Sequence, residues 1–423
     1  MREAFDPMET LAAGITKAVV RIKVVGVGGG GNSVLLRLSE DKIPGIELIA
    51  VNTDTKQLAV LQEAGIEVMQ IGERMTRGRG TGGVAEVGAK AAESDLSRLE
   101  MALRDADLVF ITAGMGGGVG TGAAPVIARL VQKLGVLSIG VVTVPFSFEG
   151  KRKVRTADEG VEALRDALDA LLVIHNDNLM KLTDNKRMTL VDSFKAADNI
   201  LRQAILCISE VILTTGVINV DFADVVSIFR QSHSSDALLG IGESPTGRVV
   251  EAVQRAIESP LVERELNGAK GLVLNISGDQ RLSLYDVNEA MEYVTEHTHP
   301  EVNIIFGVIQ EPALGDTVRA TLVATDIIDS ADLYRTPKVR QEQPTAGKRQ
   351  PMAQRRPSVS MPMEESAARE SVPKQSAPHE APAPMKDFEI QVPDFIANRR
   401  NAIPPLTMHE DDGTPIPPFR PKR

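Results

Sequence analysis

The run Ala113-Gly114-Met115-Gly116-Gly117-Gly118-Val119-Gly120-Thr121-Gly122 follows an apolar, β-branched segment, residues 107–112, and opens onto a helix-like segment, residues 123–134. Glycine lets a backbone approach an anion closely, and the N–H groups and positive dipole end at the start of a helix can hold that anion. A strand, a glycine loop and a helix start together predict a phosphate cradle. For an isolated run of this kind, a glycine-rich structural turn is the alternative.

Apolar segments alternate with helical patterns on both sides of this run. Strands are expected at 19–25, 46–52, 108–112, 136–144 and 170–174, and helices at 34–39, 87–104, 123–134 and 157–168. Buried strands that alternate with helices predict an α/β fold with a doubly wound, mostly parallel, Rossmann-like sheet.

A long helix is expected next, over residues 190–213, because apolar residues recur there at spacings of three and four. They are Leu190, Phe194, Ala197, Leu201, Ile205, Ile208 and Ile212. The helix would lead into a smaller α/β domain. Its strands are expected near 271–276, 304–309 and 318–324, and its helices near 247–258 and 287–296.

The composition changes beyond residue 335, where 16 of the 24 prolines but only two of the 35 glycines are found. So few apolar residues remain that a disordered tail is expected. One apolar island, residues 388–396, is followed by Asn398-Arg399-Arg400. Apolar anchors in such a tail are typical of a segment that docks on a partner, with chance clustering as the alternative.

Charge and composition exclude several classes of protein. Residues 1–335 carry 33 Lys and Arg against 46 Asp and Glu, and the chain has no Trp and three Tyr. Both features argue against a nucleic-acid binder. No apolar stretch is long enough for a transmembrane helix and no signal peptide is apparent, so we expect a cytoplasmic protein without direct membrane insertion. The single cysteine, Cys207, is expected to be a small buried side chain.

A first glycine loop, Gly26-Val27-Gly28-Gly29-Gly30-Gly31, follows the first expected strand, and Asp54 ends the next. This G-x-G-x-x-G pattern is a dinucleotide fingerprint and makes an NAD-binding Rossmann enzyme an alternative. The second glycine loop and the lack of an obvious acid or base for hydride transfer weaken that interpretation. No G-x-x-x-x-G-K-[ST] motif supplies a lysine, so phosphate binding would rest on backbone amides and Thr121, with a divalent cation.

A third constellation is Asn219-Val220-Asp221-Phe222-Ala223-Asp224. Two carboxylates and an amide could orient a water or an ion at a phosphate. The structural alternative is an N-cap at Asp221 for a helix that begins at Phe222, with Asp224 in its first turn.

Taken in chain order, these segments resemble FtsZ, the bacterial relative of tubulin, over residues 19–330. The matching segments are GVGGGGN (26–32), IAVNTD (49–54), ITAGMGGGVGTGAAPV (111–126), PFSFEG (145–150), FKAADNIL (194–201) and NVDFAD (219–224). The tail segment IQVPDFIANRR (390–400) is similar to the partner-binding peptide of that family.

The resemblance implies a GTPase that binds GTP or GDP, with Mg²⁺ or K⁺ at the nucleotide. Glu149 would reach the ribose, Phe194 would stack on guanine, and Asp198 would accept hydrogen bonds from the guanine N–H groups. The full nucleotide-binding set that it implies is Gly28, Gly29, Gly30, Asn32, Gly116, Gly117, Gly118, Gly120, Thr121, Gly122, Glu149, Lys153, Phe194 and Asp198.

The resemblance also implies head-to-tail polymerisation into the bacterial division ring, in the cytoplasm at midcell. Asn219, Asp221 and Asp224 would enter the nucleotide pocket of the neighbouring subunit and complete it for hydrolysis. Partners would be further copies of the chain and, through residues 388–400, membrane-tethering division proteins.

The expected domain organisation follows from these segments. It consists of a flexible arm (1–18), a GTP-binding domain (19–189), a central helix (190–215), a C-terminal activating and polymerisation domain (216–335), a disordered linker (336–386), a partner-binding peptide (387–400) and a proline-rich extension (401–423).

Several positions differ from the family pattern. Val119 replaces the first threonine of the phosphate loop, and Lys153 stands where arginine is usual. Further differences are Ser33, Val84-Ala85, Val144, Asn178 and Leu239. Because valine cannot donate a hydrogen bond, a divergent structural paralogue with slow or absent GTPase activity is a second hypothesis.

Overall fold

The computed structural model describes residues 20–182, 189–213, 220–232, 234–264, 266–279, 283–311 and 314–327. Some predictions lie outside the described residues. They concern the N-terminal arm, Asn219 and everything beyond residue 327, including the linker, the peptide 387–400 and the extension.

One ten-stranded sheet runs through the described chain, in the order β3-β2-β1-β4-β5-β6-β7-β10-β8-β9. Its strands are β1 (Ile22–Val27), β2 (Ile46–Asn52), β3 (Glu67–Gln70), β4 (Leu108–Gly114), β5 (Leu137–Val144), β6 (Ala170–His175), β7 (Asp236–Ser244), β8 (Gly271–Gly278), β9 (Asn303–Gln310) and β10 (Val318–Thr325). All neighbouring pairs from β3 to β7 are parallel, as are β8 and β9. β10 is antiparallel to both β7 and β8, so the expected, mostly parallel α/β sheet is confirmed.

The helices connect these strands. They are α2 (Gly28–Asp41), α3 (Thr55–Glu63), α4 (Glu73–Thr76), α5 (Ala85–Ser94), α6 (Leu96–Leu103), α7 (Gly118–Leu134), α8 (Lys151–Arg165), α9 (Asn176–Leu182), α10 (Leu190–Leu213), α11 (Phe222–Arg230), α12 (Val249–Ile257) and α13 (Leu284–Glu296), with 3₁₀ turns η1 (Ser147–Glu149) and η2 (Leu266–Gly268).

The central strands β1, β4 and β5 bury both of their faces. Val24 packs with the apolar residues of α2, α3 and α10, whereas its neighbour Val25 packs with those of α5, α6, α7 and α8. Successive side chains of a strand point to opposite faces, so the β-branched strands form the core of a doubly wound domain.

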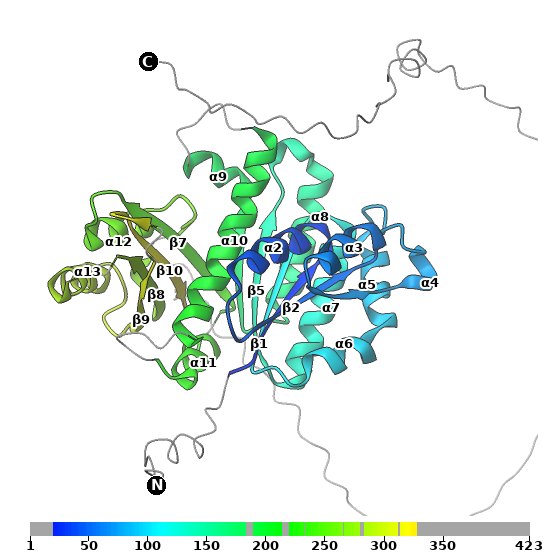
Figure 1. Cartoon of the computed structure of the whole chain (residues 1–423), viewed down its shortest axis with the longest axis horizontal. Coiled ribbons are helices and arrows are strands. Elements are labelled where there is room, and N and C mark those ends of the chain that lie inside the picture. The colour runs from blue at the N-terminus through cyan, green and yellow to red at the C-terminus, as the bar shows by residue number, and fades with distance from the viewer. Residues whose placement is uncertain are drawn as a thin grey trace, which may run out of the picture. The chain divides into compact units, whose positions relative to one another are not determined.

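The long helix α10 has the predicted bounds, and it lies between the blue-to-cyan strands and the green-to-yellow strands in Figure 1. Its apolar stripe is not buried throughout, contrary to the simple expectation. Leu190 and Phe194 are 57% and 40% exposed, whereas Ala197, Leu201 and Ile205 are buried. The first turn and a half of α10 therefore presents apolar side chains outside the core.

Two elements differ from the sequence expectation for identifiable reasons. The expected helix at 87–104 is divided at Asp95, whose carboxylate accepts from Gly72 N (2.9 Å) and from Arg98 Nη1 (3.0 Å). Strand β7 was not expected because Gly240 and Gly242 interrupt its apolar pattern. A Cβ at either glycine would overlap a backbone oxygen of α12, so the glycines let helix and strand pack closely.

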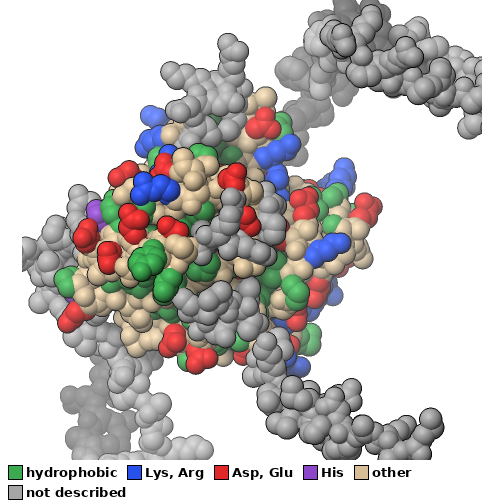
Figure 2. Space-filling model, turned by 60° about the vertical axis from the view of Figure 1, so that its left-hand side comes forward, with side chains coloured by type: hydrophobic (Ala, Val, Ile, Leu, Met, Phe, Trp, Pro, Cys, Tyr) green, Lys and Arg blue, Asp and Glu red, His purple; other side chains and the backbone are tan. Residues whose placement is uncertain are grey.

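Acidic side chains are scattered among apolar ones over the face shown in Figure 2, in keeping with the negative charge of residues 1–335. Among the helices of the described ranges, none is both long and apolar enough to cross a bilayer.

Close backbone contact between α5 and α7 gives a stability test. A Cβ at Gly122 would overlap the carbonyl oxygen of Ala85, whereas a Cβ at Gly117 would meet only Gly114 O, at 4.0 Å. We therefore expect Gly122→Ala to lower the free energy of unfolding by about 1–3 kcal/mol, despite the higher helix propensity of alanine. Gly117→Ala is the matched control and should leave urea unfolding nearly unchanged. Equal midpoints for both variants would contradict this packing account.

Candidate nucleotide site

The candidate site lies at the carboxyl ends of the parallel strands. The strand order 3-2-1-4-5-6 places the topological switch point between β1 and β4, where α2 leaves to one face and α7 to the other. In doubly wound sheets, ligands bind at this point. Both glycine loops of the sequence follow these two strands, so the structure brings them together.

The two loops touch through their backbones. Gly28 has a φ of +71°, and a Cβ there would lie 2.9 Å from Gly120 N. A Cβ on Gly30 would lie 2.9 Å from Gly114 N. These glycines therefore let α2 approach β4 and α7 closely. From the sequence alone, this packing role cannot be distinguished from a role in anion binding.

Free amide groups remain after this packing. Neither α2 nor α7 has a side-chain cap at its N-terminus. The first N–H groups of a helix have no acceptor within the helix, and here they belong to residues 28–30 and 118–120. Two uncapped helix starts that meet at one point form a cradle suited to phosphate groups.

Thr121 and Asn32 hold the loops in shape. Thr121 Oγ1 accepts a hydrogen bond from Gly116 N (2.8 Å), so this hydroxyl fixes the turn of the second loop. The amide of Asn32, oriented to satisfy all its neighbours, donates to Gly26 O (2.8 Å) and Gly28 O (3.2 Å) and accepts from Asn52 Nδ2 (2.9 Å). Asn32 is 3% exposed and holds the backbone of the first loop through these buried hydrogen bonds.

Aromatic side chains gather beside the loops, where β5 ends. Phe146 packs edge-on against Phe194 of α10, with ring centroids 5.6 Å apart, and stacks on Phe148 at 4.9 Å. Phe148 is 62% exposed, so the cluster offers an apolar surface to a planar ring. Phe146 and Phe148 were not singled out as site residues from the sequence, although both lie in the quoted segment PFSFEG.

Glu149 and Lys153 lie next to this cluster. Glu149 Oε1 accepts from Phe146 N (3.0 Å), and its Oε2 pairs with Lys153 Nζ (3.1 Å). The backbone of Lys153 also approaches the second loop, because a Cβ on Gly116 would lie 2.8 Å from Lys153 O. These residues therefore border the cradle.

Asp198 stands one helical turn after Phe194 and faces α2. Its Oδ2 accepts from Arg37 Nε (3.2 Å), a contact that no sequence pattern predicts. Burial raises the pKa of the Asp198 carboxyl, while the Arg37 guanidinium acts in the opposite direction. A half-buried carboxylate held by one oxygen can still accept from a ligand with its other oxygen.

Asp221 and Asp224 are not brought to this edge. The structure confirms that α11 begins at Phe222 with Asp221 at the N-cap position, but the Asp221 side chain makes no capping hydrogen bond. α11 ends near the amino ends of the strands, because Arg230 Nη2 donates to Gly135 O (2.7 Å), just before β5. Phe194 and α11 lie at opposite ends of α10, whose 24 residues span about 36 Å.

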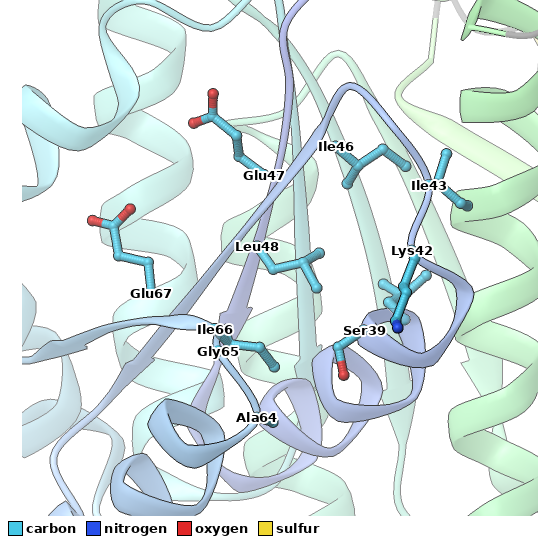
Figure 3. A pocket seen from close by; sticks show the side chains of 11 residues that line it. Ser39, Lys42, Ile43, Ile46, Glu47, Leu48, Ala64, Gly65, Ile66 and Glu67 are labelled. Carbon is cyan, nitrogen blue, oxygen red and sulfur yellow. The ribbon is translucent and has the colours of Figure 1, made fainter.

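A hollow of about 520 Å³ lies elsewhere, at the amino ends of β2 and β3 (Figure 3). Leu38, Ile43, Ile46, Leu48 and Ile66 line it, together with Lys42. It is at the opposite edge of the sheet from the glycine loops and does not belong to the candidate nucleotide site.

The fold and the cradle define a nucleotide-binding α/β protein. Comparisons with known proteins give its family. Residues 21–184 match the Tubulin/FtsZ family, GTPase domain, and residues 235–328 match the FtsZ family, C-terminal domain. The FtsZ dimer of M. jannaschii is similar at 39% identity and a TM-score of 0.71, over 76% of this chain and 92% of that one. The chain belongs to the tubulin/FtsZ family of GTPases.

A more distant likeness concerns the fold alone. CetZ2 from Haloferax volcanii, solved as a GTPγS-bound protofilament, has 22% identity and a TM-score of 0.61, over 74% of this chain and 95% of that one.

The buried carboxylate of Asp198 gives a pH-dependent prediction. Its raised pKa means that the ionised form destabilises the folded, nucleotide-free protein above that pKa, and that this cost disappears as the pH falls through it. Asp198→Asn should therefore raise the urea midpoint at neutral pH, with a difference from the wild type that shrinks in acid. A difference that grows in acid would contradict the assignment.

Val119 gives a second prediction. Its side chain is 8% exposed and packs beside Gly28 within the apolar cluster of α7. Val119→Thr keeps the shape and adds a hydroxyl beside the cradle. One added hydrogen bond stabilises by about 0.5–1.5 kcal/mol, so GTP affinity or turnover should rise about two- to tenfold. Unchanged values in a turnover assay would show that the missing hydroxyl does not limit the site.

Proposed function

We propose that this chain binds and hydrolyses GTP and polymerises head to tail, with each nucleotide site completed by the next subunit. The separation of the two groups of site residues carries this proposal. The cradle and the residues around Phe194 lie at one end of α10, while Asp221 and Asp224 are exposed at the other. Stacking subunits along this axis brings the two groups together.

In the proposed complex, the phosphates lie on the amides of the two glycine loops, residues 28–30 and 117–120. Guanine stacks at Phe194 and pairs its N–H groups with Asp198, while Glu149 and Lys153 border the ribose and phosphates. A Mg²⁺ or K⁺ ion accompanies the phosphates. The free helix starts support this arrangement, because they supply the donors that a phosphate needs.

Hydrolysis needs a group that orients water at the terminal phosphate. We assign this role to Asp221 and Asp224 of the adjoining subunit, together with Asn219. Neither carboxylate makes a hydrogen bond or an ion pair through its side chain within the described part of the chain, so both are available to a neighbour.

A slower, structural variant of this function is the second candidate. Val119 contributes to an apolar cluster and offers no hydroxyl. The Thr121 hydroxyl accepts from Gly116 N and has one hydrogen to donate. The second loop thus offers mainly backbone donors to the phosphates. A protein of this kind would bind nucleotide and assemble, but would release phosphate slowly.

The family match argues against the dinucleotide interpretation. Asp54, which would bind a ribose in that case, caps α3 with its Oδ1, which accepts from Lys56 N (2.9 Å).

At the cellular level, we propose that the chain acts in the cytoplasm at the division site, as part of the bacterial division ring. Residues 388–400 would recruit membrane-tethering division proteins. The family membership and the apolar island in the sequence support this proposal.

Turnover as a function of protein concentration tests the proposal. Turnover per subunit should be near zero in dilute protein and rise steeply above a critical concentration, at which polymer also begins to sediment. Asp224→Ala should reduce turnover at least about 100-fold, the usual size of a general-base contribution, and leave GTP affinity of the monomer unchanged.

Glu289→Gln, an exposed carboxylate on α13, serves as the control and should behave as the wild type. Polymer without phosphate release would favour the slower structural variant. Loss of GTP binding by monomeric Asp224→Ala would contradict the assignment of this residue to the neighbouring site.

A further inference from the structure

The segment 77–84, Arg-Gly-Arg-Gly-Thr-Gly-Gly-Val, runs from the carboxyl end of β2 to the start of α7. One end is held beside β2, because Thr55 N donates to Gly78 O (3.3 Å) and Arg79 forms an antiparallel bridge with Asp54. The other end is held on α7, because a Cβ on Gly118 would lie 2.8 Å from Val84 N. The end of β1 and its glycine loop lie between these two attachments.

The order of the strands indicates which part of a nucleotide meets this segment. Phe146 follows β5 and contacts Phe194, so a base stacked there lies on the β5 side of the cradle. The phosphates then follow the edge past β4 and β1 toward β2. The terminal phosphate is farthest from the base and therefore comes nearest to residues 77–84.

Two arginines lie on this segment. Arg77 is the C-cap of α4 and its N–H donates to Glu73 O, whereas Arg79 is attached at the β2 end through the bridge to Asp54. Its side chain is exposed, and its guanidinium has no hydrogen bond or ion pair with the part of the chain that the structure describes. Two other cations at the site are already paired, Lys153 with Glu149 and Arg37 with Asp198. Neither glycine loop contains a lysine or arginine, so the cradle itself offers amides but no full positive charge.

We propose that Arg79 binds the terminal phosphate of the bound nucleotide and makes the site prefer the triphosphate over the diphosphate. This inference rests on the proposed GTP site and adds a residue that sets its selectivity. A guanidinium presents paired donors that match phosphate oxygens, and such charge-assisted bonds are about twice as strong as neutral ones. The interaction exists only while the terminal phosphate is present.

The test compares the affinities of purified, full-length monomer for radiolabelled GTP and GDP by equilibrium dialysis, below the concentration at which polymer sediments. Arg79→Gln should weaken GTP binding about tenfold or more and leave GDP binding within about twofold, as expected for the loss of one charge-assisted hydrogen bond. Arg79→Lys keeps the charge without the paired donors and should recover part of the GTP affinity.

Arg74→Gln is the matched control. Arg74 is an exposed arginine on α4, at the outer edge of the domain in Figure 1, and its replacement should change neither affinity. Equal weakening of GTP and GDP by Arg79→Gln would overturn the proposal, since it would indicate a structural role. Unchanged affinities with a higher critical concentration would also overturn it and assign Arg79 to the contact between subunits. If the wild type bound neither nucleotide, the proposed GTP site itself would be wrong.

Discussion

Backbone contact between the two glycine loops is the constraint on which the site depends. Gly28 approaches Gly120, and Gly30 approaches Gly114, so closely that a Cβ would press on backbone atoms. This contact brings the uncapped starts of α2 and α7 to the same point at the carboxyl edge. Without a lysine in either loop, binding of an anion there relies on helix amides and dipoles, which only such close packing can concentrate.

The helix α10 sets the second condition. Near its start, Phe194 contacts Phe146 and Asp198 contacts Arg37, so both side chains are held beside the cradle. The opposite end of the helix leads to α11. A subunit built in this way holds a nucleotide site at one end and exposed carboxylates at the other. Hydrolysis that needs both would then depend on assembly, which is a consequence of the length of one helix.

The sequence predicted the elements whose periodicity is strong. The bounds of α10 and β2 were predicted without error, and the parallel, doubly wound sheet followed from apolar strands alternating with helices. Strand β7 was not predicted from the sequence. Its glycines allow close packing against α12, and this tertiary contact leaves no signal in the local sequence pattern.

For the site, the glycine loops and the base-side residues could be placed from motifs. The residues that contact them could not be predicted. Arg37 reaches Asp198, and Phe146 reaches Phe194, only through the tertiary fold. The sequence predicts Thr121 as a phosphate ligand, and this stays a prediction. The structure adds that Thr121 Oγ1 accepts from Gly116 N, a contact that depends on the turn between them and leaves the hydroxyl hydrogen to donate.

A crystal structure of the chain with a non-hydrolysable GTP analogue would show where the nucleotide binds. We expect the phosphates on the amides of residues 28–30 and 117–120, with guanine between Phe194 and Asp198. Electron density for the base or ribose beside Asp54 at the end of β2, as in a dinucleotide-binding fold, would contradict it.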